Sequence, residues 1–476
     1  MTVPVMAAGQ ALAAAEKPNI VFVLIDDMGW TDAKCFGSDF YETPNIDRLY
    51  SQSMYFPNAY MASSICSPSR AALNYGQYPG RYDFNEVADA QRFRSQRGTK
   101  LIAPDICELP PGDGMTLPRV LQTAGYHTAL IGKWHVGGSE ETRPLDFGYQ
   151  ERLHRPRDTD PADMKNIDWI TDQAIDFMAR QKDSGKPFFL FVSHEAIHHD
   201  YYCSDELLKK YEEKLSPGLR HSYPVYAGNL EHLDRGIGRM MDGMEKLGLS
   251  ENTIVVFSSD NGGRTANIEY QRSTSNHPLK HGKHTFFEGG VRVPLMVRWP
   301  GRVTAGAICE TPVHGVDFLP TFADIAQVDT AVYSETDGVS FFPLCLNRNV
   351  ELTRRHDGLY WYYPHYILEL SPGPKTYCAP IRPMAAIRKG DWKLLWYFED
   401  AGLAELFNLR EDAGEETNMA KKYPQLVDEM KSLLFDWLKD TGTALPKSNP
   451  LYNPELPDVL LKKSADTFYP PVTGLP

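Results

Sequence analysis

The stretch Asn19-Ile20-Val21-Phe22-Val23-Leu24-Ile25, followed directly by Asp26-Asp27, decides the fold class of this chain. Its continuous apolar run is rich in β-branched residues and predicts a strand buried on both faces, as in parallel sheets covered by helices. Residues 128–131, 188–192 and 253–257 have the same character. The sequence therefore predicts a buried, largely parallel sheet.

Helical patterns alternate with these strands. The predicted helices are residues 117–124, 167–182 and 226–247, and the last carries Leu230 and Ile237 on one apolar face. Alternation of strands and helices is typical of an α/β sandwich built around a large, mostly parallel sheet.

Polar side chains follow four of these strands, just beyond their carboxyl ends. Ligands of open α/β sheets bind at this edge, so residues far apart in the sequence are expected to converge there. The residues concerned are Asp26, Asp27, Lys133, His135, His198, Asp260 and Asn261.

Four of these residues offer only oxygen as a ligand: Asp26, Asp27, Asp260 and Asn261. Carboxylate and amide oxygens are hard ligands that suit Ca²⁺ or Mg²⁺ rather than Zn²⁺. A single Asp at such a position often caps a helix or forms a turn. Two acidic motifs at strand ends together favour a metal site.

The string Cys66-Ser67-Pro68-Ser69-Arg70 places a thiol at a predicted helix start. Pro68 suits the first helical turn, and Gly76 suits a left-handed exit from the helix. A helix N-terminus presents free N–H groups and the positive end of its dipole, so it attracts an anion, and Arg70 adds a cation. The alternative is a capped surface helix with a buried cysteine.

Two lysines join Arg70 as candidates for neutralising the charge that builds up on an anionic group in a transition state. Lys133 lies in Gly132-Lys133-Trp134-His135 after a buried strand. Lys283 lies in the polar segment 279–285, where Lys280 is its rival.

His135 and His198 are the candidate acid and base, because imidazole titrates near neutrality and serves in either role. The chain has 14 histidines, so most of them have other roles. His199 is an immediate rival of His198.

Length, charge and cysteine usage narrow the classes of function. A chain of 476 residues suggests two domains, or one large domain with an appendage. The net charge of −13 argues against a nucleic-acid binder, which would present a basic surface. No stretch is long and apolar enough to span a bilayer. The seven cysteines show no zinc-binding spacing, and their pairing cannot be read from the sequence.

The chain is expected to have four parts. Residues 1–16 are Ala-rich and predict a signal-peptide remnant or a disordered leader. Residues 17–350 form the larger α/β domain, 351–445 a smaller α+β domain with an antiparallel sheet, and 446–476 a Pro-rich tail on the surface. The smaller domain is expected to contain strands at 358–363, 385–388, 392–398 and 405–408 and a helix at 424–439.

The Cys-x-Pro-Ser-Arg string at residues 66–70 resembles the modification signature of the type I sulfatases. The resemblance extends over residues 18–49, 125–137, 187–198, 226–263, 283–300 and 313–321. It implies an alkaline-phosphatase-like sandwich with a smaller C-terminal domain. It also implies that a maturation enzyme oxidises Cys66 to formylglycine, which acts as the nucleophile in its hydrated form.

Matched residue by residue, the resemblance assigns a role to each candidate. It implies a metal held by Asp26, Asp27, Asp260 and Asn261 with residue 66 in contact, and a catalytic set of Cys66, Arg70, Lys133, His135, His198 and Lys283. It favours Ca²⁺ over Mg²⁺ at this largely protein-built site. Ile197 stands where the family usually has Pro, and His284 where it usually has Gly. Neither change removes a functional group.

The resemblance implies a covalent route, which divides one hard step into two easier ones. A hydroxyl of residue 66 attacks sulfur while His198 protonates the departing alcohol oxygen. His135 then removes a proton from the sulfated diol, which releases sulfate. Two alternatives remain open: a phosphatase or phosphonate monoester hydrolase of the same superfamily, and a glycan-binding protein without activity.

A sulfated carbohydrate is the expected substrate, with a sulfated galactose or N-acetylgalactosamine residue favoured. Trp361 and His365, in Trp361-Tyr362-Tyr363-Pro364-His365-Tyr366, are candidates for contacting the sugar ring, and core packing is the equal alternative. The insertion at 85–111 is a candidate for shaping the mouth of the site. A periplasmic or extracellular location is expected, and the oligomeric state is left open.

Overall fold

The computed structural model describes residues 17–87, 99–107, 110–112, 114–154, 163–265, 267–268, 271–366, 382–399 and 403–455. The predicted leader, much of the insertion at 85–111 and residues 456–476 of the tail lie outside this part. The expected signal segment, and with it the periplasmic or extracellular location, therefore stays a prediction.

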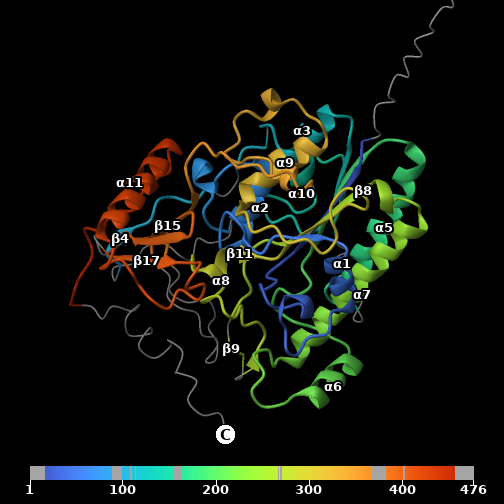
Figure 1. The fold of residues 1–476 in the computed structure, drawn as a ribbon, viewed down its shortest axis with the longest axis horizontal. Coiled ribbons are helices and arrows are strands. Elements are labelled where there is room, and N and C mark those ends of the chain that lie inside the picture. Colours follow the sequence, from blue (N-terminus) through green and yellow to red (C-terminus); the bar gives the residue numbers. More distant parts are fainter. Residues whose placement is uncertain are drawn as a thin grey trace, which may run out of the picture.

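A seven-stranded sheet forms the centre of the larger part of the molecule (Figure 1), in the order β2-β12-β8-β1-β7-β5-β6. Its middle strands are parallel, and β12 runs antiparallel to both β8 and β2, so the predicted mostly parallel sheet is confirmed. The strands are β1 (Asn19–Ile25), β2 (Met54–Tyr55), β5 (His127–Gly132), β6 (Glu151–Leu153), β7 (Phe188–His194), β8 (Thr253–Ser259) and β12 (Leu295–Arg298).

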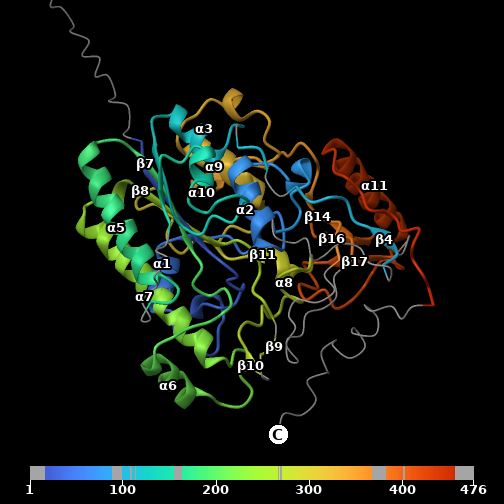
Figure 2. The same cartoon turned by 180° about the vertical axis from the view of Figure 1, so that it is seen from behind.

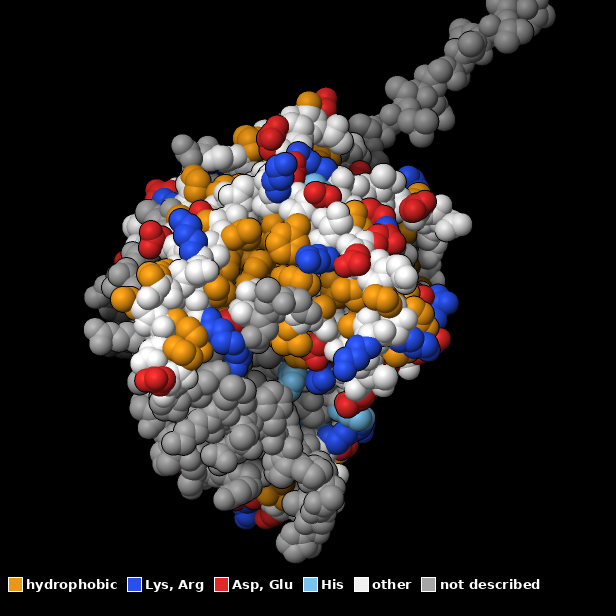
Figure 3. Space-filling model, turned by 90° about the vertical axis from the view of Figure 1, so that its left-hand side faces the viewer, with side chains coloured by type: hydrophobic (Ala, Val, Ile, Leu, Met, Phe, Trp, Pro, Cys, Tyr) orange, Lys and Arg blue, Asp and Glu red, His pale blue; other side chains and the backbone are white. Residues whose placement is uncertain are grey.

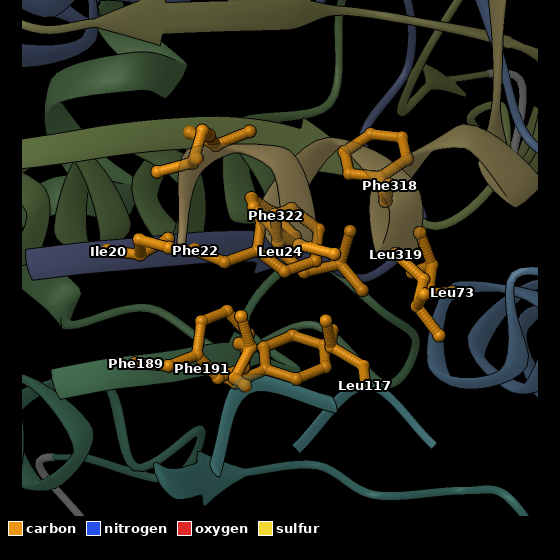
Figure 4. Packing of buried hydrophobic residues seen from close by; sticks show 14 of the residues in the cluster. Ile20, Phe22, Leu24, Leu73, Leu117, Phe189, Phe191, Phe318, Leu319 and Phe322 are labelled. Carbon is orange, nitrogen blue, oxygen red and sulfur yellow. The ribbon is translucent and has the colours of Figure 1, made fainter. Parts of the chain in front are cut away.

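Helices cover both faces of this sheet, and Figures 1 and 2 show them as two separate groups. Val21, Val23 and Ile25 of β1 belong to the core beneath α1 (Pro44–Ser51), α5 (Ile167–Ser184) and α7 (Pro224–Lys246). The alternate β1 residues belong to the core beneath α2 (Cys66–Tyr75), α3 (Leu117–Thr123) and α9 (Phe318–Ile325). In that second core the Phe22 ring lies 4.9 Å from Phe191 and 5.3 Å from Phe318 (Figure 4).

The C-terminal part contains a four-stranded antiparallel sheet, as predicted, in the order β14-β15-β16-β17. Its strands are β14 (Leu359–Tyr363), β15 (Met384–Lys389), β16 (Trp392–Tyr397) and β17 (Ala404–Asn408). One face of this sheet packs against α11 (Pro424–Asp440). The other face packs against Ile65 and Cys66 at the start of α2, so the C-terminal sheet and the larger part of the molecule share a core beside that helix.

Short elements complete the described part of the chain. The helices are α4 (Arg143–Asp146), α6 (Asp205–Lys214), α8 (Glu288–Val291) and α10 (Phe342–Cys345). The 3-10 helices are η1 (Lys34–Phe36), η2 (Pro79–Tyr82), η4 (Ser250–Asn252), η5 (Gly315–Asp317) and η6 (Thr330–Tyr333). The strands are β3 (Ala59–Tyr60), β4 (Leu101–Ile102), β9 (Asn267–Ile268), β10 (Gln271–Arg272), β11 (Arg292–Val293), β13 (Val313–His314) and β18 (Lys447–Ser448).

The surface carries charges of both signs. On the face in Figure 3, Lys and Arg side chains are interspersed with Asp and Glu, and hydrophobic side chains gather near its centre. Among the described residues, no helix is both long and apolar enough to cross a membrane. The six cysteines of that part are all free thiols.

Candidate active site

An acidic cluster lies at the carboxyl edge of the large sheet, where the sequence places it. Asp26 and Asp27 follow β1, and Asp260 and Asn261 follow its parallel neighbour β8, so the strand pairing brings the four side chains together. All four are buried, with at most 3% of each residue exposed. Asn261 Nδ2 donates to Asp27 Oδ1 over 2.8 Å, and the Asp27 backbone N–H donates to Asp260 Oδ1 over 3.2 Å.

The thiol of Cys66 faces this cluster from the first residue of α2. The helix ends at Gly76, whose φ of 64° is left-handed and whose N–H donates to Ala72 O, so the predicted helix start and exit are confirmed. Cys66 is 2% exposed. Its Sγ lies within 4.8 Å of a carboxylate oxygen of Asp26 and of Asp260.

Each carboxylate of the cluster has its own cation. Lys133 Nζ is paired with Asp26 Oδ2, and Lys283 Nζ lies 2.5 Å from Asp27 Oδ1. Arg70 Nε donates to Asp260 Oδ2 over 2.8 Å. Three cations therefore surround the space next to the thiol.

Lys280, the rival of Lys283, lies outside this cluster. Its Nζ donates instead to the backbone carbonyl of Glu415 over 2.9 Å. The structure thus brings Lys283 to the acidic cluster and leaves Lys280 as a support of the neighbouring loop.

The pKa values in the cluster follow from burial and from these pairs. Burial raises the pKa of the Asp26 carboxyl, but Lys133 and the other nearby cations outweigh it and hold that pKa well below its ordinary value. The pKa of Asp27 is lowered in the same way, with Lys283 as the leading cation. Burial and the neighbouring Asp26 raise the pKa of Asp260 well above its ordinary value, against the effect of Arg70.

Three buried oxygen atoms of the cluster fit a bound cation. Asp26 Oδ1, Asp27 Oδ2 and Asn261 Oδ1 have no hydrogen-bond partner within the described part of the chain. A buried polar atom without a partner carries a desolvation cost that a ligand can offset. An all-oxygen set of this kind suits a hard divalent cation.

His198 and His135 lie on the same side of the cluster. His198 Nε2 is 3.8 Å from Asp27 Oδ2, and its Nδ1 lies 2.6 Å from the carbonyl oxygen of His199. A carbonyl can only accept, so Nδ1 carries a proton there and Nε2 faces the site. Burial lowers the pKa of both His198 and His135 to about 3.

His199, the rival of His198, is exposed, although one of its ring nitrogens lies within 4.8 Å of both Asp27 and His198. The ring centroids of the two histidines are 4.2 Å apart. Both histidines lie close to Asp27, so distance from the acidic cluster does not decide between them. For the two lysines it does, because only Lys283 contacts the cluster.

A cavity of about 300 Å³ adjoins the cluster. Its lining includes Lys133, His135 and His198 from the predicted set, and also Lys165 and Glu195. Lys165 Nζ donates to the His198 carbonyl over 2.8 Å. A molecule bound in this cavity would contact both histidines.

The structure places Trp361 and His365 in the core. Trp361 is 1% exposed and its indole N–H donates to the Met61 carbonyl over 2.7 Å. His365 is 2% exposed and packs against Tyr363. Both rings are buried, as the core-packing alternative expects, and a role of this segment in contacting a sugar stays a prediction.

Sequence reasoning missed two supports of the site. Ser193 near the end of β7 accepts a hydrogen bond from Arg70 Nη1 over 2.7 Å. Glu140 accepts the backbone N–H groups of Trp134 and His135 over 2.9 and 2.8 Å, which fixes the turn that carries His135. Ser193 follows a buried run, as Asp26 does, and that signal could have revealed it.

A mostly parallel sheet, a thiol at a helix start and an acidic cluster ringed by cations together suit an enzyme of the α/β class that acts on anionic esters. Comparisons with known proteins agree. The family model "Sulfatase" matches residues 18–328, and "N-sulphoglucosamine sulphohydrolase, C-terminal" matches residues 279–440. The chain belongs to the sulfatase family and is a sulfatase enzyme.

Similar proteins cover most of the chain. A sulfatase of Formosa agariphila is 29% identical over 91% of both chains. The N-acetylgalactosamine-6-sulfatase of Rattus norvegicus is 31% identical over 74% of this chain and 70% of its own. A crystal structure of Ps i-CgsB in complex with k-i-k-neocarrahexaose has a TM-score of 0.71 at 26% identity, covering 95% of this chain and 97% of that one.

The family uses a metal ion and a formylglycine residue, and the alkaline-phosphatase-like fold implied by the resemblance is confirmed. The acidic cluster and its unpartnered oxygens fit such an ion. Cys66 Sγ stands where a formylglycine would carry its aldehyde or diol oxygens.

Proposed function

We propose that this sulfatase removes sulfate from a sulfated galactose or N-acetylgalactosamine residue, with a formylglycine made from Cys66 as nucleophile and Ca²⁺ as the metal. One observation carries the proposal. The Cys66 side chain lies within 4.8 Å of the Asp26 and Asp260 carboxylates, at a helix start ringed by three cations.

Asp26, Asp27, Asp260 and Asn261 would hold the cation. When bound, it would supply positive charge that polarises a sulfate ester and acidifies a neighbouring hydroxyl. Three carboxylates and one amide from the chain favour Ca²⁺, since Mg²⁺ usually keeps several waters.

The cationic side chains hold the substrate. Lys133 and Lys283 would bind the sulfate oxygens, where their charge stabilises the transferring group. Arg70 is 1% exposed and reaches Asp260 and Ser193, so it also fixes the carboxylate beside residue 66.

The two histidines move protons. His198 Nε2 faces the cavity, and because Nδ1 already carries a proton, the ring acts as an acid only as the imidazolium, whose second proton at Nε2 would pass to the departing alcohol oxygen. His135 lines the same cavity, and its Nδ1 has no partner within the described residues, so it can accept a proton from residue 66.

The substrate class rests on the relatives. The rat relative is named an N-acetylgalactosamine-6-sulfatase, and the Ps i-CgsB structure holds a k-i-k-neocarrahexaose. The cavity supports a sugar beside His198, because Lys165 and Glu195 in its lining can bond hydroxyl groups as donor and acceptor.

Two measurements test the proposal. Mass spectrometry of the peptide containing residue 66, from a host able to modify it, should show an aldehyde. A panel of sulfated sugars should release sulfate with the wild type and not with Cys66→Ala, which should fold normally. Full turnover by that variant would refute the mechanism.

The same panel tests the rivals. A phosphatase or phosphonate monoester hydrolase would prefer phosphate or phosphonate esters to sulfates. A glycan-binding protein would retain an intact thiol and bind sugars without releasing sulfate.

A further inference from the structure

The geometry points to Glu415, in the C-terminal part of the chain, as a positioning residue for Lys283. We infer that Glu415 holds both ends of the segment 280–288 and thereby fixes the Lys283 ammonium beside Asp27. The inference rests on the proposed role of Lys283 in binding the sulfate group.

Glu415 contacts both ends of this segment. Its carboxylate Oε2 accepts the backbone N–H of Glu288 over 2.6 Å. Its backbone carbonyl accepts Lys280 Nζ over 2.9 Å. Lys283 lies between these two anchor points, and its Nζ lies 2.5 Å from Asp27 Oδ1.

A buried ion cluster fixes Glu415 itself. Glu288, Lys393 and Glu415 are all fully buried, and Lys393 Nζ lies 2.8 Å from Glu288 Oε1 and 3.1 Å from Glu415 Oε1. The other Glu288 oxygen accepts Tyr60 OH over 2.6 Å. Buried charges persist when they are paired and hydrogen-bonded, so this cluster has few alternative arrangements.

This segment and Gly289 and Gly290, which directly follow it, also support the acidic cluster. The Lys283 N–H donates to the Gly263 carbonyl over 3.1 Å, and the Gly262 N–H donates to the Gly290 carbonyl over 2.9 Å. A Cβ added at Gly262 would lie 1.8 Å from the Gly289 carbonyl oxygen, so the two backbones are in close contact. A shift of 280–288 would therefore reach the residues after β8.

This arrangement couples the C-terminal sheet to the sulfate-binding group. Lys393 lies on β16 and Glu415 follows β17, whereas Asp27 follows β1 of the larger sheet and Lys283 lies in the loop before α8. Loss of the Glu415 carboxylate frees the Glu288 N–H and leaves Lys393 with one carboxylate fewer. The expected result is a looser Lys283 and weaker binding of a sulfate group.

A double-mutant cycle between Glu415 and Lys283 tests the coupling. Inorganic sulfate serves as the probe, and its dissociation constant, which equals its inhibition constant when it competes with substrate, is measured by calorimetry so that Lys283→Ala needs no turnover. Glu415→Ala should raise the sulfate inhibition constant at least about fivefold, a normal size for coupled residues. In a Lys283→Ala background the same change should have less than about a twofold effect. If Glu415→Ala raised the constant by the same factor in the wild type and in the Lys283→Ala background, the inference would be overturned.

A second readout does not depend on activity. Amine labelling followed by mass spectrometry reports how accessible each lysine is, and Lys283 should react faster in Glu415→Ala while Lys133 stays unchanged. Glu416→Ala is the matched control, because Glu416 is the exposed neighbour. An unchanged Lys283 rate would overturn the inference, whereas a wild type without sulfate-ester turnover would overturn the proposed function alone.

A milder change covers the case in which Glu415→Ala does not fold. Lys280→Met removes the contact with the Glu415 carbonyl and the cation above the Phe287 and Phe407 rings, and it leaves the Glu415 carboxylate in place. It should raise both the sulfate inhibition constant and the Lys283 labelling rate, by less than Glu415→Ala does. No change in either quantity would contradict the anchoring role of Glu415.

Discussion

Lys393→Met is expected to destabilise the protein in a pH-dependent way. The Lys393 side chain is fully buried and its Nζ lies 2.8 and 3.1 Å from the carboxylates of Glu288 and Glu415, which are also fully buried. Met fills much of the same volume but carries no charge. The variant would therefore keep two buried carboxylates with one cation fewer.

The size of the effect follows from that geometry. Removing one partner of a buried ion pair costs about 3–5 kcal/mol. Burial raises the pKa of Glu415 to about 7, and Lys393 opposes that rise. At pH 5 the Glu415 carboxyl is therefore largely protonated, so the variant loses less stability than at pH 8, where both carboxylates are charged.

The sign of the pH dependence is fixed by the direction of the shift. The folded pKa of Glu415 lies above its ordinary value of 4.5. The folded state then binds more protons between about pH 4.5 and 7, so this residue's contribution to stability falls as pH rises through that window. Losing Lys393 raises the pKa of Glu415 further and extends the fall above pH 7.

Glu288 has the opposite dependence. Burial raises its pKa, but Lys393, Arg292 and Arg388 outweigh it and lower the pKa to about 2. Its contribution is present above about pH 4.5 and is lost as pH falls toward 2. Measurements between pH 5 and 8 therefore report mainly on Glu415.

Thermal unfolding of the wild type and Lys393→Met at pH 5 and pH 8 checks the reasoning. The variant should unfold at a lower temperature at both pH values, with the larger loss at pH 8. Lys421→Met, at an exposed position, should match the wild type. Adding Glu415→Gln to Lys393→Met should restore part of the loss at pH 8. An equal loss at both pH values, or none at pH 8, would refute the argument.

Three further outcomes are expected. A chelator should abolish turnover and Ca²⁺ should restore it better than Mg²⁺, because the cluster offers only oxygen; zinc as the sole native metal by anomalous scattering would contradict this. His198→Ala should impair hydrolysis of sugar sulfates about 10²–10⁴-fold and that of nitrophenyl sulfate much less, because an aryl oxide leaves without a proton. His199→Ala should be mild on both, and equal losses for His198→Ala would remove it from the acid role. His365→Ala should lower the melting temperature without changing the ratio of kcat/KM for sugar and aryl sulfates, because the ring is buried; a loss confined to sugars would support the sugar-contact interpretation.

The sequence predicted the large sheet and most of the site for a physical reason. Strands buried on both faces appear as continuous apolar runs, and chemistry at a parallel sheet is concentrated just past the strand ends. Asp26 after β1 and Asp260 after β8 follow this rule, so their meeting could be expected without knowledge of any contact. The helix at Cys66 could also be predicted from neighbouring residues alone, since Pro68 and Gly76 mark its two ends.

Contacts between the C-terminal sheet and the larger part of the molecule could not be read from the sequence. Trp361 lies on a strand whose alternate residues are all aromatic or apolar, so its pattern does not show which face meets the larger part of the molecule. The structure turns Trp361 toward Cys66 and Tyr360 toward α11. An exposed aromatic surface that binds a sugar and a buried aromatic strand have the same sequence pattern here. Only the packing in the folded structure distinguishes them.

Lys393 and Glu415 show the same limit for charged residues. In the sequence each is one of many Lys and Glu residues, most of which are expected to be solvated. Their burial follows from the packing of the C-terminal sheet on the start of α2 and on α8, which places Glu288 within reach of both.

The division of the chain at residue 350 therefore stays a prediction, and the shared core argues for two parts that depend on each other. Tyr60, Ile65 and Cys66 are covered on one side by residues of the C-terminal sheet. Without that sheet they would be exposed next to the acidic cluster, and Glu288 would lose both Lys393 and Glu415. The larger sheet carries Asp26 and Asp260 just past its strand ends, and the smaller sheet covers the helix start that presents residue 66.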